Sequence, residues 1–256
     1  MSYNLSFISD KDLLAHVTET VKKYRFKISL NDLNKNLIDP VKLTFDSIVY
    51  HGKTDNLALE EVLNNEAIRQ IDKSNTNHIG YFHQNIFRYI GKNQGWKVPK
   101  KGYDVENVKL NIFVEMKNKH NTMNSSSSAK TYMRMQNTIL HNPDATCYLA
   151  EVIASNSQNI EWVCSLDKQK VSHPKIRRIS IDKFYALVTG EENAFAQLCG
   201  ILPKVITDAV SQNARRLIKN TVLEDLQIQH AESILQRLYL LAFSEYQGFD
   251  HFQLHD

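Results

Sequence analysis

The sequence predicts an α/β (α+β) fold, in which a mixed central β-sheet is flanked by helices and further helices extend both ends of the chain. Between residues 77 and 153, one helical pattern, three strand patterns, a second helical pattern and a fourth strand pattern follow one another. Helical spacing of apolar residues also occupies the first quarter of the chain and the part after residue 183. We expect a single domain over residues 1–256, with its core at about residues 76–166.

Helical patterns dominate the first ninety residues. We expect helices at residues 9–24, 57–71 and 77–90, and a short helical turn at residues 31–37. Ser9 can cap the first helix, because Asp12 lies three residues further on. The turn should end at Asp39-Pro40, since the residue before a proline avoids helical geometry. Gly91 is a typical terminator of the third helix, whereas residues 41–50 have mixed spacing and leave helix and strand open.

Strand patterns begin after Gly91 and continue to residue 181, interrupted by one helix, and only helices are expected after that. We expect strands at residues 95–98, 103–107, 110–117, 146–153 and 179–181, with a further candidate at 160–166. A polar loop at residues 118–124 precedes a helix at residues 127–140, which Asn142-Pro143 ends. The remaining helices are expected at residues 183–188, 194–198, 204–218 and 222–243.

Charged residues interrupt the apolar strand predicted at residues 110–117. Alternation places Glu115 and Lys117 together on one face, and Asp104 precedes the strand by a short turn. Two carboxylates and a lysine on a β-hairpin are typical of a magnesium-dependent phosphodiesterase, because carboxylate oxygens bind hard cations and an ammonium group can orient or activate water. The alternative is a surface hairpin with solvated charges, but unpaired charges in a core strand are costly.

Magnesium prefers octahedral oxygen ligation and retains several waters. The candidate ligands are the carboxylates of Asp104 and Glu115, together with the backbone carbonyl of Met116. Lys117 would position hydroxide or stabilise charge in the transition state. The sequence leaves open whether one or two metal ions bind.

Positive charge is concentrated around these residues. The chain has a net charge of only +3, but residues 92–120 hold seven lysines against three acidic residues. Such an excess favours a polyanion such as double-stranded DNA. Polar and basic side chains after the strand are candidates to contact phosphates or base edges, and they are Lys119, His120, Asn121, Asn124, Lys130 and Arg134.

The remaining composition indicates a soluble, cytoplasmic protein without a membrane partner. Cys147, Cys164 and Cys199 are few and widely spaced, which argues against a disulfide framework and against a zinc site. The N-terminus has no apolar signal-peptide core, and no apolar run is long enough to span a bilayer.

The chain resembles the PD-(D/E)-x-K nuclease superfamily. Tyr103-Asp104 stands at the Pro-Asp position, and Glu115-Met116-Lys117 stands at the (D/E)-x-K position. Over most of its length it is similar to type II restriction endonucleases that cut GGNCC. The segments that carry this similarity are residues 39–45, 72–87, 102–123 and 179–190.

The resemblance implies a restriction-endonuclease-like core and a magnesium-dependent, site-specific enzyme that leaves 5′-phosphates. It implies a homodimer on a palindromic site, and a cognate DNA methyltransferase as a functional partner without direct contact. In this superfamily the helix before the hairpin often supplies an extra acid, but here no acid lies between Lys73 and Gly91. His83 or Gln84 would then bind a metal water, and Gln136 would point into the site from the following helix.

Two other functions remain open at this point. A structure-specific or DNA-repair nuclease of the same fold would cut without sequence preference. A catalytically inactive DNA-binding module would keep the fold and lose the metal, although the complete set of Asp104, Glu115 and Lys117 argues against this.

Overall fold

The computed structural model describes residues 2–32, 39–120, 122–211, 218–227 and 233–243, together with Gln253. Contacts within the chain divide it into two compact units. Unit 1 comprises Met1–Lys23 and Asn77–Ala214, and unit 2 comprises Tyr24–Thr76 and Arg215–Asp256. The expected single domain over residues 1–256 stays a prediction beside this division.

Unit 1 contains a mixed five-stranded sheet in the order β2-β3-β4-β8-β5. The strands are β2 (Val105–Asn107), β3 (Ile112–Lys119), β4 (Thr146–Ile153), β8 (Ile176–Ser180) and β5 (Asn159–Glu161). Strands β3, β4 and β8 are parallel, whereas the edge strands β2 and β5 are antiparallel to their neighbours. Together with the helices on its faces, this mixed sheet confirms the predicted fold class.

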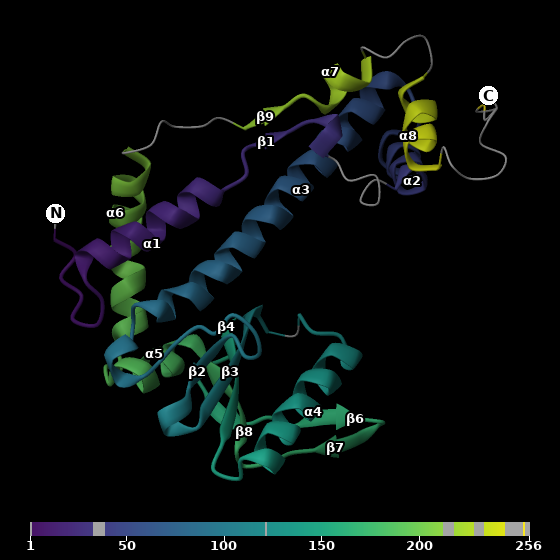
Figure 1. Cartoon of the computed structure of the whole chain (residues 1–256). Coiled ribbons are helices and arrows are strands. Elements are labelled where there is room, and N and C mark those ends of the chain that lie inside the picture. The colour runs from purple at the N-terminus through teal and green to yellow at the C-terminus, as the bar shows by residue number, and fades with distance from the viewer. Residues whose placement is uncertain are drawn as a thin grey trace. The chain divides into compact units, whose positions relative to one another are not determined.

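Helices cover both faces of this sheet, as Figure 1 shows for α4 (Ser125–His141) and α5 (Ile181–Thr189). Successive residues of β4 point to opposite faces. Leu149 therefore packs in a cluster with Tyr132 of α4, while Tyr148 packs in a cluster with Phe184 of α5. Burial on both faces explains the nearly continuous apolar sequence of the central strand.

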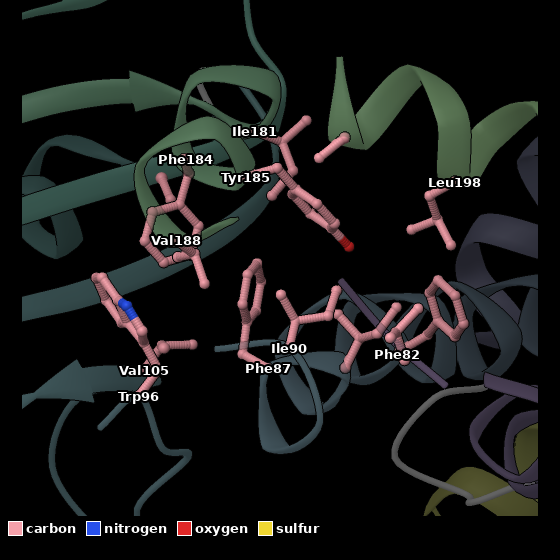
Figure 2. Close-up of a cluster of buried hydrophobic side chains, with 14 of the residues drawn as sticks. Phe82, Phe87, Ile90, Trp96, Val105, Ile181, Phe184, Tyr185, Val188 and Leu198 are labelled. Atoms are coloured by element: carbon pink, nitrogen blue, oxygen red, sulfur yellow. The ribbon is translucent and has the colours of Figure 1, made fainter. Parts of the chain in front are cut away.

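The larger cluster joins α5 to the segment that follows α3 (Figure 2). Phe184 lies between Phe87 and Trp96, with ring centres 4.8 and 5.6 Å away respectively. Gly91 turns the chain between those two aromatic residues with a φ of +71°, and a Cβ there would come within 2.6 Å of Val188. Glycine is therefore required at this position both for its backbone conformation and for close packing.

Helices α1 (Asp10–Lys23) and α6 (Ala194–Ser211) pack against each other in unit 1 (Figure 1). Ser9 caps α1 as predicted, since its Oγ accepts the backbone N–H of Asp12 at 3.1 Å. The helices expected at residues 194–198 and 204–218 form one helix that runs through Pro203. Residues 212–217 lie outside the described part of the chain.

Unit 2 is mainly helical. Its elements are β1 (Lys27–Ile28), α2 (Pro40–His51), the first part of α3 (Asn56–Asn85), β9 (Lys219–Asn220), α7 (Val222–Gln227) and α8 (Ile234–Phe243). Strands β1 and β9 form a parallel pair. Leucines of α3 and α8 share one buried cluster, in which Leu59 and Leu238 are almost completely inaccessible. Residues 41–50, for which the sequence left helix and strand open, are helical and belong to α2. Asp39 caps the start of this helix.

Several predicted boundaries were wrong. The two helices expected at residues 57–71 and 77–90 form the single helix α3, because the polar run between them contains no proline or glycine to break the hydrogen bonds. The strand expected at 95–98 reduces to one bridge between Lys97 and Glu106. Residues 160–166 divide between β5 and β6 (Cys164–Leu166), and β6 pairs with β7 (Gln169–Val171).

The remaining differences between the expected and the observed elements concern short 3-10 helices and residues that the structure does not describe. Short 3-10 helices occupy Leu30–Asp32, Ile86–Arg88, Lys92–Gln94 and Val108–Leu110. Residues 33–38, which include most of the turn expected at 31–37, lie outside the described residues, as do residues 228–232 between α7 and α8. Within the described helices, no segment is long and apolar enough to cross a membrane.

Candidate active site

The hairpin of β2 and β3 holds Asp104 against the middle of β3. The backbone N–H of Asp104 donates to the Val114 carbonyl at 3.0 Å, immediately before β2 begins. Two residues further along β3, the Asp104 side chain takes the place of a neighbouring strand. Its Oδ2 accepts the Met116 N–H at 2.7 Å. The side chain thus continues the hydrogen bonding of β3 where strand β2 has ended.

Glu115 and Lys117 share the face of β3 that carries α4, as strand alternation requires. Lys117 Nζ lies 2.8 Å from Glu115 Oε1. The Glu115 side chain is only 13% exposed and that of Lys117 is 31% exposed. A largely buried carboxylate needs such a partner, because desolvating an unpaired charge is costly.

Arg134 reaches the same carboxylate from α4. Its Nη2 donates to Glu115 Oε2, and its Nη1 donates weakly to the Gly102 carbonyl at 3.4 Å. The guanidinium carbon lies 4.5 Å from the centre of the Tyr103 ring, which is a cation–π geometry. The Tyr103 ring thus forms a platform for Arg134, and the Tyr103 hydroxyl lies 2.8 Å from Thr138 Oγ1.

The charged neighbours of Asp104 shift its pKa in opposite directions. Burial and the neighbouring Glu115 raise the pKa of Asp104 above its ordinary value, and the Met116 N–H, Lys117 and Arg134 partly offset them. The two carboxylates face two cations, so their formal charges cancel. A site that keeps a carboxylate's pKa raised in this way favours an added positive charge.

The available donors fit a hard divalent cation. Asp104 and Glu115 supply carboxylate oxygens, and the Met116 carbonyl faces the side of Asp104, because a strand residue's N–H and C=O point the same way. Among the described residues, no group of three or more His, Cys, Asp and Glu side chains could hold a metal. Two carboxylates with waters and substrate oxygens match magnesium, which is commonly bound in this manner.

The supporting residues expected from the sequence lie at different distances from this site. Gln84 contacts it, since its Nε2 donates to the Asp104 carbonyl at 3.4 Å. His83 packs against the Phe82 ring, and burial together with His16 lowers its pKa to about 4. Its Nδ1 has no hydrogen-bond partner among the described residues. Gln136 is half-buried on α4.

The expected DNA-binding residues occupy the end of β3, the loop after it and α4. Lys119 and Lys130 are exposed, whereas Asn121 lies outside the described residues. Asn124 caps α4, because its Oδ1 accepts the Ser127 N–H at 2.8 Å. The carboxamide oxygen of Asn124 is therefore already used within the protein.

His120 belongs to a buried charge cluster that the sequence analysis did not anticipate. Its Nδ1 lies 3.1 Å from Glu151 Oε1 and 2.9 Å from Arg178 Nη2, and Arg178 also pairs with Glu151. Glu151 is 1% exposed and lies in register with Lys117 on the neighbouring strand. The sequence signal was present, because Glu151 interrupts an otherwise apolar strand, but its partners come from distant segments.

Comparison with known proteins identifies the chain as a type II restriction enzyme, a site-specific deoxyribonuclease. It belongs to the Eco47II restriction endonuclease family, whose sequence profile matches residues 5–211. The chain is 36% identical over 217 residues to the type II restriction enzyme Sau96I of Staphylococcus aureus, covering 80% of each chain. It is 28% identical over 221 residues to the type II restriction enzyme Eco47II of Escherichia coli, covering 81% of this chain and 89% of that protein.

These matches confirm the predicted resemblance and the predicted enzyme class. Enzymes of this class act on double-stranded DNA and generally require a divalent metal ion. The sequence-specific endonuclease is therefore preferred over the repair nuclease and the inactive binding module.

Proposed function

We propose that Asp104, Glu115 and Lys117 form the catalytic centre for magnesium-dependent hydrolysis of DNA phosphodiester bonds. The observation that carries this proposal is their convergence on one point of β3. Asp104 is fixed there by the Met116 N–H, and Glu115 lies 2.8 Å from Lys117. The superfamily motif and membership of a restriction endonuclease family support the same assignment.

Each of these residues has a distinct part in the proposed mechanism. Asp104, Glu115 and the Met116 carbonyl would hold Mg²⁺, which when bound supplies Lewis acidity and neutralises charge on the phosphate. Lys117 Nζ would orient the attacking water and stabilise negative charge that develops on the phosphate oxygens. Gln84 would keep the Asp104 backbone in place through its hydrogen bond to the carbonyl. The water loses a proton as its oxygen bonds to phosphorus, the bond from phosphorus to the 3′-oxygen breaks, and the 3′-oxygen takes up a proton, so that a 3′-hydroxyl and a 5′-phosphate remain.

His83 and Gln136 have weaker structural support as active-site residues. His83 is largely buried and uncharged near neutral pH, because its pKa is lowered to about 4. It would therefore act by packing α3 or by a neutral hydrogen bond to a water. Gln136 follows Arg134 by two positions on α4, and residues at that spacing point in different directions, so its support is the resemblance to the superfamily.

The proposed DNA surface continues from β3 to α4. Lys119, Lys130 and Arg134 would contact phosphates, and the loop containing His120 and Asn121 would approach base edges. Asn124 would use its amide NH₂ group, since its oxygen caps α4. The similarity to enzymes that cut GGNCC supports a palindrome of that type as the target.

A palindromic target favours a homodimer, because a twofold protein presents one active site to each strand. We further propose a cytoplasmic location, with a cognate methyltransferase that protects the same site without contacting this protein. Both proposals follow from the role of restriction enzymes and from the family match.

Incubation of the purified protein with plasmid DNA and Mg²⁺ tests the proposed function. Discrete fragments that disappear in excess chelator are the expected result. A smear, or cutting of branched DNA only, would indicate a repair nuclease, and retarded DNA without cutting would indicate a binding module.

A further inference from the structure

Both carboxylate oxygens of Glu115 contact a cation. Oε1 lies 2.8 Å from Lys117 Nζ, and Oε2 accepts a hydrogen bond from Arg134 Nη2. Lys117 comes from the same strand, two residues away, whereas Arg134 comes from α4, nineteen residues away. The second contact thus depends on the position of α4 on the sheet.

A divalent cation bound to Glu115 and Asp104 would lie within a few ångströms of the Arg134 guanidinium. Without a metal, Lys117 and Arg134 balance the two carboxylates. Adding two positive charges leaves an excess that is repulsive at this distance, particularly beside a carboxylate that is only 13% exposed. Metal and Arg134 therefore compete for the same carboxylate.

Arg134 can leave Glu115 without disturbing the fold. Its side chain is 41% exposed, and its other contacts are the face of the Tyr103 ring and a long hydrogen bond to the Gly102 carbonyl. These contacts hold the guanidinium beside the site but do not bury it. A phosphate that approached the metal would offer Arg134 a new anionic partner with bidentate geometry.

We propose that Arg134 occupies Glu115 in the metal-free protein and transfers to the scissile phosphate when metal and DNA bind. This inference rests on the proposed function, since it takes Asp104 and Glu115 as the metal ligands. DNA binding would release Glu115 to the metal, and metal binding would release Arg134 to the DNA. Each ligand thereby increases affinity for the other, as thermodynamic linkage requires. Arg134 would keep metal affinity low until substrate is present.

The test measures Mn²⁺ binding to the intact protein without DNA, from the paramagnetic resonance signal of free Mn²⁺. Arg134→Gln should bind Mn²⁺ about tenfold more tightly than wild type, because a competing unit charge has been removed. The matched control is Lys183→Gln, which removes another cation paired with a glutamate, Glu192, at 2.9 Å. It should leave Mn²⁺ affinity unchanged. If a folded Arg134→Gln protein bound Mn²⁺ no more tightly than wild type, Arg134 would not compete with the metal for Glu115.

The second measurement is the single-turnover cleavage rate at saturating Mn²⁺. Arg134→Gln should cleave at least tenfold more slowly than wild type despite its tighter metal binding, because the phosphate has lost a contact. Tighter binding with a wild-type cleavage rate would overturn the transfer to phosphate. Asp104→Asn distinguishes failure of the underlying assignment, since unaltered Mn²⁺ affinity in that variant would show that the metal binds elsewhere.

Discussion

Asp104 occupies an unfavourable environment for an ionised carboxylate. It precedes β2, is partly buried and lies beside a second carboxylate, so its pKa is raised. Its carboxylate is nevertheless fixed by the Met116 N–H at 2.7 Å. The hydrogen bond thus holds in place a carboxylate whose charged form is disfavoured by its surroundings, and a bound cation would favour that charged form.

The role assigned to Lys117 predicts a large and specific loss of activity. Lys117→Ala should reduce single-turnover cleavage by about a hundredfold or more, whereas DNA affinity should change little. Lys109→Ala provides the control, because Lys109 is exposed on the same hairpin and pairs with neither carboxylate. Cleavage within a few-fold of wild type would show that Lys117 has only a structural or phosphate-side role.

The lowered pKa of His83 predicts pH-dependent stability. The folded pKa is about 4, whereas an unfolded histidine titrates near its ordinary value of about 6.5. The neutral His83 ring therefore makes its full contribution to the free energy of unfolding when the pH is above that ordinary value. This contribution is lost as the pH falls from there through the folded pKa. Between pH 7.5 and 5 the free energy of unfolding should fall by about 2 kcal/mol from this group.

Urea unfolding of wild type and His83→Leu at these two pH values measures the contribution. The variant should lose less stability on acidification, because it cannot bind the proton. An equal loss in both proteins would mean that His83 does not carry the effect.

Local spacing alone selected the hairpin residues of the candidate site. Asp104, Glu115 and Lys117 lie within one short segment, and strand alternation places the last two on one face. The pairing of Arg134 with Glu115 instead depends on how α4 packs on the sheet, which single-sequence patterns do not specify. The partners of Glu151 were missed for the same reason, since they come from the loop after β3 and from β8.

Helices and strands were easiest to predict where burial gives the whole element one pattern of apolar residues. Strand β4 spans Thr146–Ile153, as expected, because both of its faces are covered. Helix α3 was divided in error, since a polar stretch within a helix loses the apolar period although its hydrogen bonds continue. The short strands β1, β7 and β9 were not predicted, because two or three residues carry too little periodicity.

The turn after α3 predicts a difference between two glycine substitutions. Gly91→Ala should destabilise unit 1 by about 1–3 kcal/mol more than Gly190→Ala, because its Cβ would meet Val188 and Trp96. Both positions have positive φ, but a Cβ at Gly190 would meet nothing within 4 Å. Chemical denaturation of both variants measures the difference, and equal losses would show that close packing at Gly91 contributes nothing beyond backbone strain.

The proposed homodimer would present one active site to each strand of the proposed palindromic target. Mixing wild-type and Asp104→Asn subunits should therefore yield heterodimers that nick the site on one strand. The product ratio of nicked to linear plasmid measures this effect. A protein that sediments as a strict monomer with and without cognate DNA, and still makes double-strand breaks, would rule out the twofold arrangement.

The division into two units was beyond the reach of the sequence patterns. Unit 2 is assembled from two segments that are far apart in the chain, and its boundary falls within α3. No change in composition or proline-rich linker marks that boundary. The interface residues of a dimer are equally hidden, because an apolar helix face packs in a core or between subunits with the same spacing.

We propose that Asp104 and its neighbours bind the metal ion that makes DNA cleavage possible. The decisive measurement is single-turnover cleavage of a mapped site by wild type and Asp104→Asn across Mg²⁺ concentrations, with DNA affinity measured in parallel. Asp104→Asn should cleave about a thousandfold or more slowly at every Mg²⁺ concentration, because it lacks a charged metal ligand. Its DNA affinity should be retained or increased, because one negative charge is removed from the phosphate site. Near-wild-type cleavage by this variant, or wild-type cleavage in excess chelator, would show that Asp104 does not bind a metal ion required for cleavage.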